Sequence, residues 1–447
     1  MLLTIEKLIY GGDGLARLPA ESPGAKDRGQ GKAVFVPFVL EGEEVEASLI
    51  EEKPGFARAH ATEIVKPSTH RIQPQCPYFG ACGGCHHQHA DYAHQLEIKK
   101  AILRETLRRI AKLELQCEIQ AHPSPPWNYR NRSRLQIQTQ PEFATGYFKY
   151  SSHELLPIEN CPISSPLINR GIAALWETGR AGKAEGVREI EFFANADDSL
   201  MLVELSCAPG ARRAAVRAWA EELRAAMPEI AGVNAFIFNH PQKGGTKPLL
   251  RVGASELSYR TESSTYRVSA GSFFQTNRFL VDELSRIVTG GRSGELALDL
   301  YAGVGLFSTA LACNFRHIVS VESSQTAASD LQYNLPGSGK VVQATTEQYA
   351  CGLGDDGRAG NDSVLPDLAG RPDLMVVDPP RSGLGDRVGR ALGKVCAPRL
   401  TYVSCDPATL ARDLLPLLAA GYRVEEVHLV DLFPQTYHLE SVVQLVR

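Results

Sequence analysis

The stretch LALDLYAGVGLFS, residues 296–308, decides the fold class of this 447-residue chain. It begins as a buried-type strand that ends at Asp299, turns at Gly303 and Gly305, and continues as an apolar helix. Helical stretches separate three further runs of the same buried type, which occupy residues 317–323, 372–380 and 399–407. Strands that alternate with helices form a doubly wound parallel sheet, and ligands bind at the carboxyl ends of its strands. We therefore expect a Rossmann-like α/β domain over residues 266–447.

The composition is that of a folded protein with several domains. Apolar residues make up 43% of the chain and charged residues 22%, which excludes a largely disordered polypeptide. A chain of this length is too long for a single core, so we expect about three domains. The net charge of −4 indicates no strong electrostatic preference, and any nucleic-acid binding must depend on local arginines.

Nothing in the sequence indicates export or membrane insertion. The first residues, MLLTIEKLIYGGDG, are charged by Glu6 and lack the apolar core of a signal peptide. The most apolar later stretch is interrupted by Asp299 and two glycines, which argues against a membrane span. We expect a cytoplasmic monomer that does not bind membranes, in which ten cysteines are not expected to form disulfides.

Two smaller domains are expected before the α/β domain, so the whole chain is a multidomain α/β protein. Residues 1–66 alternate apolar and polar residues between glycines and prolines, which predicts a small OB-like β-barrel. This segment has eight Lys and Arg residues against eleven Asp and Glu residues. Residues 67–265 combine strand-like runs with helical ones, which is typical of an α+β domain. An amphipathic helix is expected at 93–116, with an apolar face formed by Leu96, Ala101, Leu103, Leu107 and Ile110.

A cluster of cysteines stands in the loop before this helix. Cys76, Cys82 and Cys85 have C-x5-C-x2-C spacing, and two adjacent glycines allow the backbone to turn the three thiols toward one point. Cys161, which precedes a proline, is the best fourth ligand. Four thiolates suit an iron-sulfur cluster or zinc, and spacing does not separate the two. A Cys₃His zinc site stays open because three histidines follow, namely His86, His87 and His89.

The turn after residue 300 predicts a nucleoside-binding site. Gly303 and Gly305 allow close approach of a ligand to the backbone, and Glu322, about twenty residues further on, is placed to hold both ribose hydroxyls. A pyrophosphate-binding turn would have a third glycine where Ser308 stands, so a cofactor without phosphates fits better. S-adenosylmethionine is such a ligand. Asp378 leaves the end of the strand at 374–377 and points to the same site.

Cys405 follows the last parallel strand and precedes a helix, where charge or a helix N-terminus can increase its thiolate fraction. A strand-end cysteine is also a common buried residue. Near the C-terminus, His438 and Glu440 alternate on an expected strand, so their side chains share one face. A cysteine, an aspartate and a glutamate that converge on a cofactor would provide a nucleophile, an orienting group and a general base.

At this point the sequence resembles the RNA uracil-C5 methyltransferases that contain an iron-sulfur cluster, a family of ribosomal-RNA 5-methyluridine enzymes related to tRNA enzymes. The resemblance spans nearly the whole chain. It is carried by GGDGLAR in an N-terminal TRAM-type domain, CPYFGACGGCHHQH with NCP, YRNRSR, SFFQTN, DLYAGVG, DPPR, SCDPATLARDL and FPQTYHLE.

The resemblance implies a role for each matching residue. Cys405 corresponds to the nucleophile and Glu440 to the base that removes the C5 proton. Cofactor-binding or uracil-contacting positions correspond to Gln275, Tyr301, Glu322 and Asp378. The ligands of a [4Fe-4S] cluster correspond to Cys76, Cys82, Cys85 and Cys161.

The expected reaction is methylation of uridine C5 through a covalent cysteine adduct at C6, with 23S ribosomal RNA as the preferred substrate and tRNA uridine-54 as the alternative. Phe273 or Phe274 would stack on the extruded base. Arg132 shares a strand face with Arg130 and Arg134 and would hold phosphate, although a solvated face is an equally good reading. Two other functions stay open: an amino-group nucleic-acid methyltransferase and a noncatalytic iron-sulfur RNA-binding protein.

Overall fold

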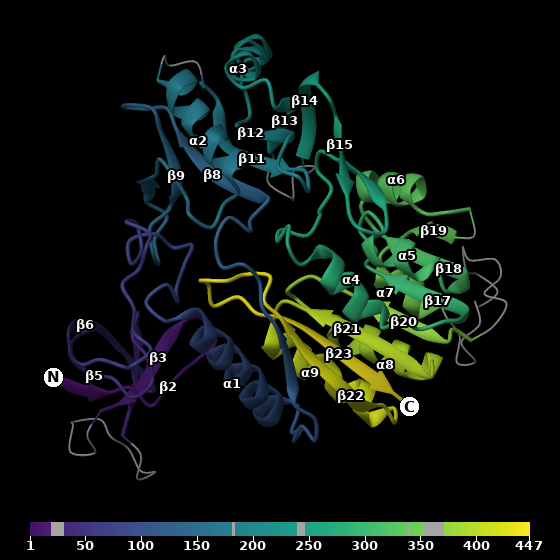
Figure 1. Cartoon of the computed structure of the whole chain (residues 1–447), viewed down its shortest axis with the longest axis horizontal. Helices are drawn as coiled ribbons and strands as arrows, with labels where there is room; N and C mark the ends of the chain where they lie inside the picture. Colours follow the sequence, from purple (N-terminus) through teal and green to yellow (C-terminus); the bar gives the residue numbers. More distant parts are fainter. Residues whose placement is uncertain (19–30, 181–183, 239–245, 338, 353–370) are drawn as a thin grey trace. The chain divides into compact units, whose positions relative to one another are not determined.

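The computed structural model describes residues 1–18, 31–180, 184–238, 246–337, 339–352 and 371–447 (Figure 1). These residues divide into two compact units. The first comprises Met1–Glu105, Phe148–Leu156 and Phe433–His438, and the second comprises Thr106–Tyr147, Pro157–Leu432 and Leu439–Arg447. The loop expected at 351–370 lies, beyond Gly352, outside the described residues. No helix in the described part of the chain is long and apolar enough to span a membrane.

The N-terminal strands of the first unit form a mainly antiparallel sheet in the order β1-β5-β6-β4-β3-β2. Their bounds are β1 (Leu2–Thr4), β2 (Lys7–Leu8), β3 (Asp13–Arg17), β4 (Ala33–Pro37), β5 (Glu44–Glu52) and β6 (Phe56–Lys66). Side chains on a strand alternate between two faces, so Val34 and Val36 of β4 enter the core while Phe35 between them does not. The alternation that predicted a small β domain is therefore present.

Helix α1 (Tyr92–Ile110) is shorter than the expected 93–116. It ends because Lys112 takes a left-handed backbone with φ 55°, and the amide groups of Ala111 and Leu113 both donate to the Leu107 carbonyl. The buried face also differs from the expected one. Ile110 is 40% exposed, whereas Ile98 and Ile102 are buried with Leu103 and Leu107.

The central part of the chain forms a mixed sheet in the order β10-β9-β8-β11-β12-β13-β14, the α+β arrangement expected from the sequence. Its strands are β8 (Arg132–Gln138), β9 (Ala144–Phe148), β10 (Leu155–Pro157), β11 (Val187–Ala194), β12 (Met201–Cys207), β13 (Ile230–Phe238) and β14 (Thr246–Gly253). Helix α3 (Arg213–Ala226) connects the parallel pair β12 and β13 and packs on α2 (Pro166–Gly179). A separate hairpin, β15 (Glu256–Arg260) and β16 (Thr265–Ser269), follows.

The C-terminal part forms the doubly wound sheet, in the order β19-β18-β17-β20-β21-β23-β22-β7. Its strands are β17 (Gly294–Leu300), β18 (Phe315–Glu322), β19 (Gly339–Gln343), β20 (Leu374–Val377), β21 (Arg399–Ser404), β22 (Arg423–Val430) and β23 (Glu440–Val446). Strands of this kind are apolar along their whole length because helices cover both faces of the sheet. The fully buried strand β20, with the sequence LMVV, illustrates this.

Helices flank both faces of this sheet. They are α4 (Val281–Thr289), α5 (Leu306–Leu311), α6 (Gln325–Asn334), α7 (Thr346–Gly352), α8 (Gly385–Val395) and α9 (Pro407–Ala419). Figure 1 shows α4, α5 and α6 on one side and α8 and α9 on the other. One strand was not expected here: β7 (Ile119–His122), from the segment assigned to the central domain, pairs with β22 at the sheet edge. The sequence of these four residues does not indicate which strand they pair with. That pairing becomes visible only in the tertiary structure.

Candidate functional site at the carboxyl edge of the sheet

The carboxyl edge of the doubly wound sheet brings the expected catalytic residues into one region. Strand β20 ends immediately before Asp378 and β21 immediately before Cys405. Strand β23 runs antiparallel to β21, with Ser441 opposite Ser404, so its first residue, Glu440, lies at the same edge. Asp378 and Glu440, about 27 and 35 positions from Cys405 in the sequence, are therefore close enough to raise the pKa of its thiol.

The Cys405 thiol is in a strongly acidic environment. Burial, followed by the negative charges of Glu440 and Asp378, raises its pKa to about 12. The helix expected after it exists as α9, but its first amide groups are already engaged: the Asp406 carboxylate accepts hydrogen bonds from Ala408 N at 3.0 Å and Thr409 N at 2.9 Å. The helix N-terminus therefore stabilises the Asp406 carboxylate, and the help expected for Cys405 is not provided there.

Glu440 is only 6% exposed, and its pKa is raised well above the usual value, first by burial and then by the Asp378 charge. A carboxyl group in this state is a strong proton acceptor once ionised. The other half of the expected terminal pair is placed differently. Strand β23 begins at Glu440, and His438 lies in the preceding segment, where its amide donates to Thr436 Oγ1 at 3.2 Å.

Arg381 is a residue to which the sequence reasoning assigned no role. It is exposed, directly follows the Asp378-Pro-Pro turn, and its positive charge lowers the pKa values of both Cys405 and Glu440. Its charge partly offsets the acidic surroundings of the thiol. The signal was present in DPPR, because a charged residue after a rigid strand-end turn is held near the sheet edge.

The glycine turn after β17 has the backbone that close ligand approach requires. Gly303 has φ 56° and Gly305 φ 98°, and a Cβ on Gly305 would lie 2.7 Å from Leu331 Cδ1. Tyr301 also has a positive φ of 64°, which is uncommon for a bulky residue and occurs at functional turns. Glu322 accepts hydrogen bonds from Gly303 N at 2.9 Å and Ser324 N at 2.7 Å, so this carboxylate ties the turn to the end of β18.

Ser308 occupies the position where a pyrophosphate-binding turn has glycine, and the structure shows why. Its hydroxyl donates to the buried Asp299 carboxylate and lies 2.8 Å from Ser320 Oγ. Asp299 lies inside β17, one residue before its end, and burial raises its pKa to about 7. These hydrogen bonds join α5, β17 and β18 beneath the turn.

The SFFQTN loop presents one aromatic ring to solvent. Phe273 is 59% exposed and Phe274 is 2% exposed, so only Phe273 has a face available for stacking; Gln275 beside them is half-buried. Asp330 of α6 fixes the segment that leads into this loop. Its carboxylate accepts hydrogen bonds from Arg267 Nε, from the Ser269 amide and hydroxyl, and from the Ser272 hydroxyl. Sequence reasoning did not identify Asp330.

Arg132 faces the protein more than solvent. Its Nη2 donates to the Ser272 carbonyl at 2.9 Å, and its guanidinium lies 4.5 Å from the centre of the Phe193 ring. Its side chain is 11% exposed. Arg130 lies before β8, whereas Arg134 is on the same strand face as Arg132 and pairs with Glu191. Arg132 therefore supports the Phe273 loop through its carbonyl contact.

Three of the four expected cluster ligands stand in one loop. Cys76, Cys82 and Cys85 belong to the first unit and Cys161 to the second. Within the loop, Gly84 N donates to Cys82 Sγ at 3.4 Å and Cys76 N to Gln88 Oε1 at 3.2 Å. Among the described residues, no group of three or more His, Cys, Asp or Glu side chains is arranged to hold a metal ion. The thiols suit an iron-sulfur cluster chemically, and no chemical step is assigned to a cluster.

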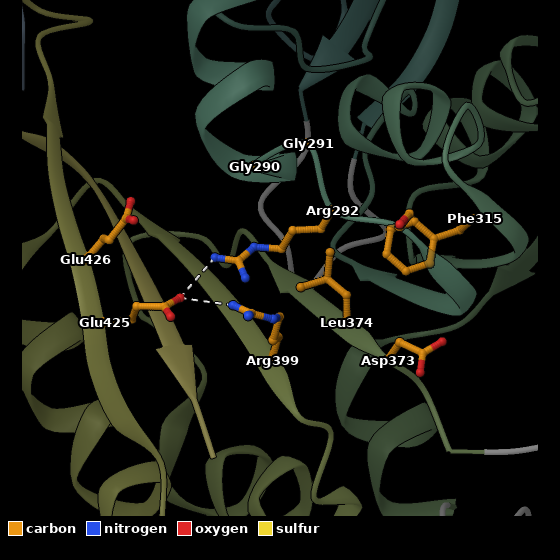
Figure 2. A pocket seen from close by; sticks show the side chains of 10 residues that line it. Gly290, Gly291, Arg292, Phe315, Asp373, Leu374, Arg399, Glu425 and Glu426 are labelled. Atoms are coloured by element: carbon orange, nitrogen blue, oxygen red, sulfur yellow. Dashed lines mark hydrogen bonds and ion pairs between the residues drawn. The ribbon is translucent and has the colours of Figure 1, made fainter.

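A pocket lies at the opposite edge of the sheet, where β17, β20 and β21 begin (Figure 2). There Arg292 and Arg399 both contact Glu425, at 3.2 Å and 3.0 Å (Figure 2). Ligands of doubly wound sheets bind at the carboxyl ends of the strands, not at this edge. The ion pairs join β21 and β22 to the loop before β17, which is a structural role.

Known proteins resemble this chain over its whole length. A family model described as tRNA (Uracil-5-)-methyltransferase matches residues 91–447, and a TRAM domain model matches residues 1–62. An RNA methyltransferase of Aquifex aeolicus, described as uncharacterized, is 32% identical over 99% of this chain and 97% of its own. Another, from Streptomyces avermitilis, is 32% identical over 93% of both chains.

Among solved structures, the tRNA (uracil-54, C5)-methyltransferase of Pyrococcus abyssi, in complex with S-adenosyl-L-homocysteine, has a TM-score of 0.72 and 24% identity over 100% of both chains. The likeness in fold therefore includes the N-terminal β domain, the central sheet and the doubly wound sheet.

Proposed function

Because the chain belongs to the tRNA (uracil-5-)-methyltransferase family and is an RNA (uracil-5-)-methyltransferase, we propose that it methylates uridine C5 with Cys405 as nucleophile and Glu440 as base. The observation that carries this assignment is the carboxyl edge of the sheet, where the negative charges of Glu440 and Asp378 raise the Cys405 pKa and that of Asp378 raises the Glu440 pKa. A thiol and a carboxyl group so coupled are the two groups that this reaction needs.

The chain's own residues perform the proton and bond changes. S-adenosylmethionine, when bound, would supply an electrophilic methyl group, whose bond to sulfur breaks to leave a neutral thioether. The Cys405 thiolate attacks C6 of uracil, and the electron pair displaced from the C5–C6 bond makes C5 nucleophilic. After C5 has accepted the methyl group, the ionised Glu440 carboxylate takes the C5 proton. The C6–sulfur bond then breaks, Cys405 leaves as thiolate, and the C5–C6 double bond is restored.

RNA with 5-fluorouridine at the target position tests the mechanism, because the base cannot remove fluorine as it removes a proton. We expect a denaturant-stable complex of protein and RNA in the presence of S-adenosylmethionine, and we expect Cys405→Ala to abolish it. With ordinary RNA, Glu440→Gln should accumulate the same complex. Methylation of RNA by Cys405→Ala would contradict the mechanism and favour amino-group methylation. Binding of cofactor without turnover would favour a noncatalytic protein.

The remaining site residues have proposed positions around this chemistry. Gly303 and Tyr301 of the glycine turn are proposed to bind the cofactor, together with Gln275 and with Glu322 at the end of β18. Phe273 is proposed to stack on the extruded base, because its ring is exposed beside the buried Phe274. Asp378 is proposed to contact both cofactor and uracil. Arg132 is proposed to contribute to substrate binding through the loop that it holds.

The RNA that carries the target uridine is proposed to be 23S ribosomal RNA, with tRNA uridine-54 as the second candidate. The description of the matching family model and that of the Pyrococcus abyssi enzyme favour the tRNA candidate. Mapping 5-methyluridine in ribosomal and transfer RNA from a strain that lacks the protein, against its parent, separates the two.

A [4Fe-4S] cluster bound by Cys76, Cys82, Cys85 and Cys161 remains a proposal based on the thiol-rich loop. Anaerobically purified protein is expected to contain about four irons and to absorb visible light. Colourless protein with one bound zinc, or with no metal, would overturn the assignment.

A further inference from the structure

A separate cavity lies wholly within the first unit and takes no part in the chemistry described above. Its volume is about 480 Å³, which is within the range of small-molecule sites. It is lined by side chains from the N-terminal β domain, the cysteine loop, the segment at 148–156 and the segment at 433–438. Segments from four parts of the chain therefore combine to form this one cavity.

Aromatic rings form most of its wall. Tyr10 and Tyr437 meet edge to face with their centroids 5.4 Å apart, and His86 lies 4.6 Å from Tyr437. Tyr150 lies 6.0 Å from the same histidine. Phe35 completes the wall from β4. Rings arranged in this way offer planar apolar faces, which planar heterocycles stack on.

Two charged side chains, Arg58 and Asp13, lie beside these rings. The Arg58 guanidinium lies 6.0 Å from the centre of the Phe35 ring and 5.9 Å from that of Phe56, and its Nη1 donates to Asp13 Oδ2 at 3.3 Å. The Tyr150 hydroxyl donates to the other oxygen of Asp13 at 3.1 Å. A cation already lies over the aromatic faces, which disfavours a cationic ligand and favours an electron-rich one.

Phe35 lies outside the hydrophobic core of the β domain. Its neighbours Val34 and Val36 enter the β-domain core, whereas Phe35 faces the other way, opposite Arg58 of β6 in the strand register. Strand residues that face outward are normally polar, so an aromatic ring, a second ring at Phe56 and an arginine on this face need another reason. Ligand contact provides one.

We propose that this cavity is a subsite for one unpaired nucleotide of the RNA substrate, whose base stacks on Phe35 and the tyrosines while Arg58 lies beside it. The choice of RNA rests on the proposed function. The N-terminal 66 residues carry a net negative charge, so binding here depends on stacking and not on neutralising phosphates. Tyr437 stands three residues before Glu440, so the subsite and the proposed base share one short stretch of chain.

The test measures binding of a single-stranded RNA of mixed sequence by fluorescence anisotropy, using the full-length protein. Phe35→Ala is expected to weaken binding roughly tenfold, and Phe35→Trp to retain it, because a planar ring remains. The ratio of the two affinities should stay constant between about 50 and 200 mM salt, because stacking releases no counterions. Ile50→Ala is the matched control, since this side chain is 69% exposed on the same β domain but away from the cavity lining, and it should not change binding.

A second measurement separates this subsite from the proposed function. The same RNA carrying 4-thiouridine should crosslink on irradiation to peptides that contain Phe35 or Tyr150, and methylation of target RNA is followed in parallel. Normal methylation with unchanged affinity in Phe35→Ala, in protein with an unaltered melting temperature, would overturn the subsite alone. Crosslinking at the cavity without methylation would overturn the proposed function and leave the subsite standing.

Discussion

At the scale of single residues, burial and nearby carboxylates keep the reactive groups protonated. The Cys405 pKa of about 12 arises from burial first and from the charges of Glu440 and Asp378 second, while Arg381 acts in the opposite direction. At neutral pH the free enzyme therefore holds mostly thiol. The thiolate that attacks the base must be produced when substrate and cofactor change this electrostatic balance.

Alkylation of Cys405 by iodoacetamide, followed by mass spectrometry of its peptide, tests this balance. We expect the alkylation rate to rise up to about tenfold per pH unit between pH 7 and 10, since the thiolate fraction grows in that proportion below the pKa. Glu440→Gln should raise the rate several-fold in this range because it removes a negative charge, and Arg381→Met should lower it. Equal rates in the two variants would show that these charges do not control the thiol.

At the scale of elements, the segment before β23 is held by an unusual set of polar contacts from the first unit. The Gln435 carbonyl accepts from the amide groups of His86 at 2.9 Å and His87 at 3.0 Å. The Gln435 backbone amide donates to Gln95 Oε1 at 3.0 Å. In return, Gln95 Nε2 donates to Gln435 Oε1, also at 3.0 Å. Lys99 of α1 is buried and donates to the Phe433 carbonyl at 2.9 Å. These contacts fix the stretch that leads into Glu440.

Substitution of Gln95 should therefore disturb the base more than the nucleophile. In Gln95→Ala we expect kcat to fall several-fold with little change in KM, because Glu440 loses part of its support while Cys405 does not. The covalent complex with ordinary RNA should consequently accumulate. Gln116→Ala is the control, since Gln116 is exposed and contacts only the Glu114 carbonyl within the described hydrogen bonds. A pure loss of stability, with unchanged kcat in the folded fraction, would contradict this positioning role.

At the scale of the whole molecule, the two units contain buried groups of opposite pH response. In the first unit, burial lowers the His89 pKa to about 4, so the unfolded chain takes up the proton first and stability is lost as pH falls from 6.5 toward 4. In the second, burial raises the Asp299 pKa to about 7, so the folded chain holds the proton more tightly and stability is lost as pH rises from 3.8 through 7. Each amounts to about 3–4 kcal/mol when complete.

Calorimetry over pH 5 to 8 should thus show two unfolding transitions that move in opposite directions. Acid should lower the transition of the first unit, and base that of the second. Asp299→Asn should reduce the pH dependence of the second transition without changing that of the first, and Asp378, whose pKa is also raised to about 7 by burial, should account for part of what is left. Two transitions that shift together, or a single transition at every pH, would contradict independent responses of the units.

The sequence by itself determined the doubly wound sheet, the glycine turn after β17 and the edge at which Asp378, Cys405 and Glu440 stand. These follow from local signals: continuous apolar runs, two glycines at a turn, and the rule that parallel strands share a carboxyl edge. The tertiary structure alone decided which charges surround the thiol, that Asp406 caps α9, that Lys99 is buried, and that β7 joins β22. Each of these depends on groups distant in sequence, because burial and Coulomb interactions act through space and leave no pattern in the residues nearby.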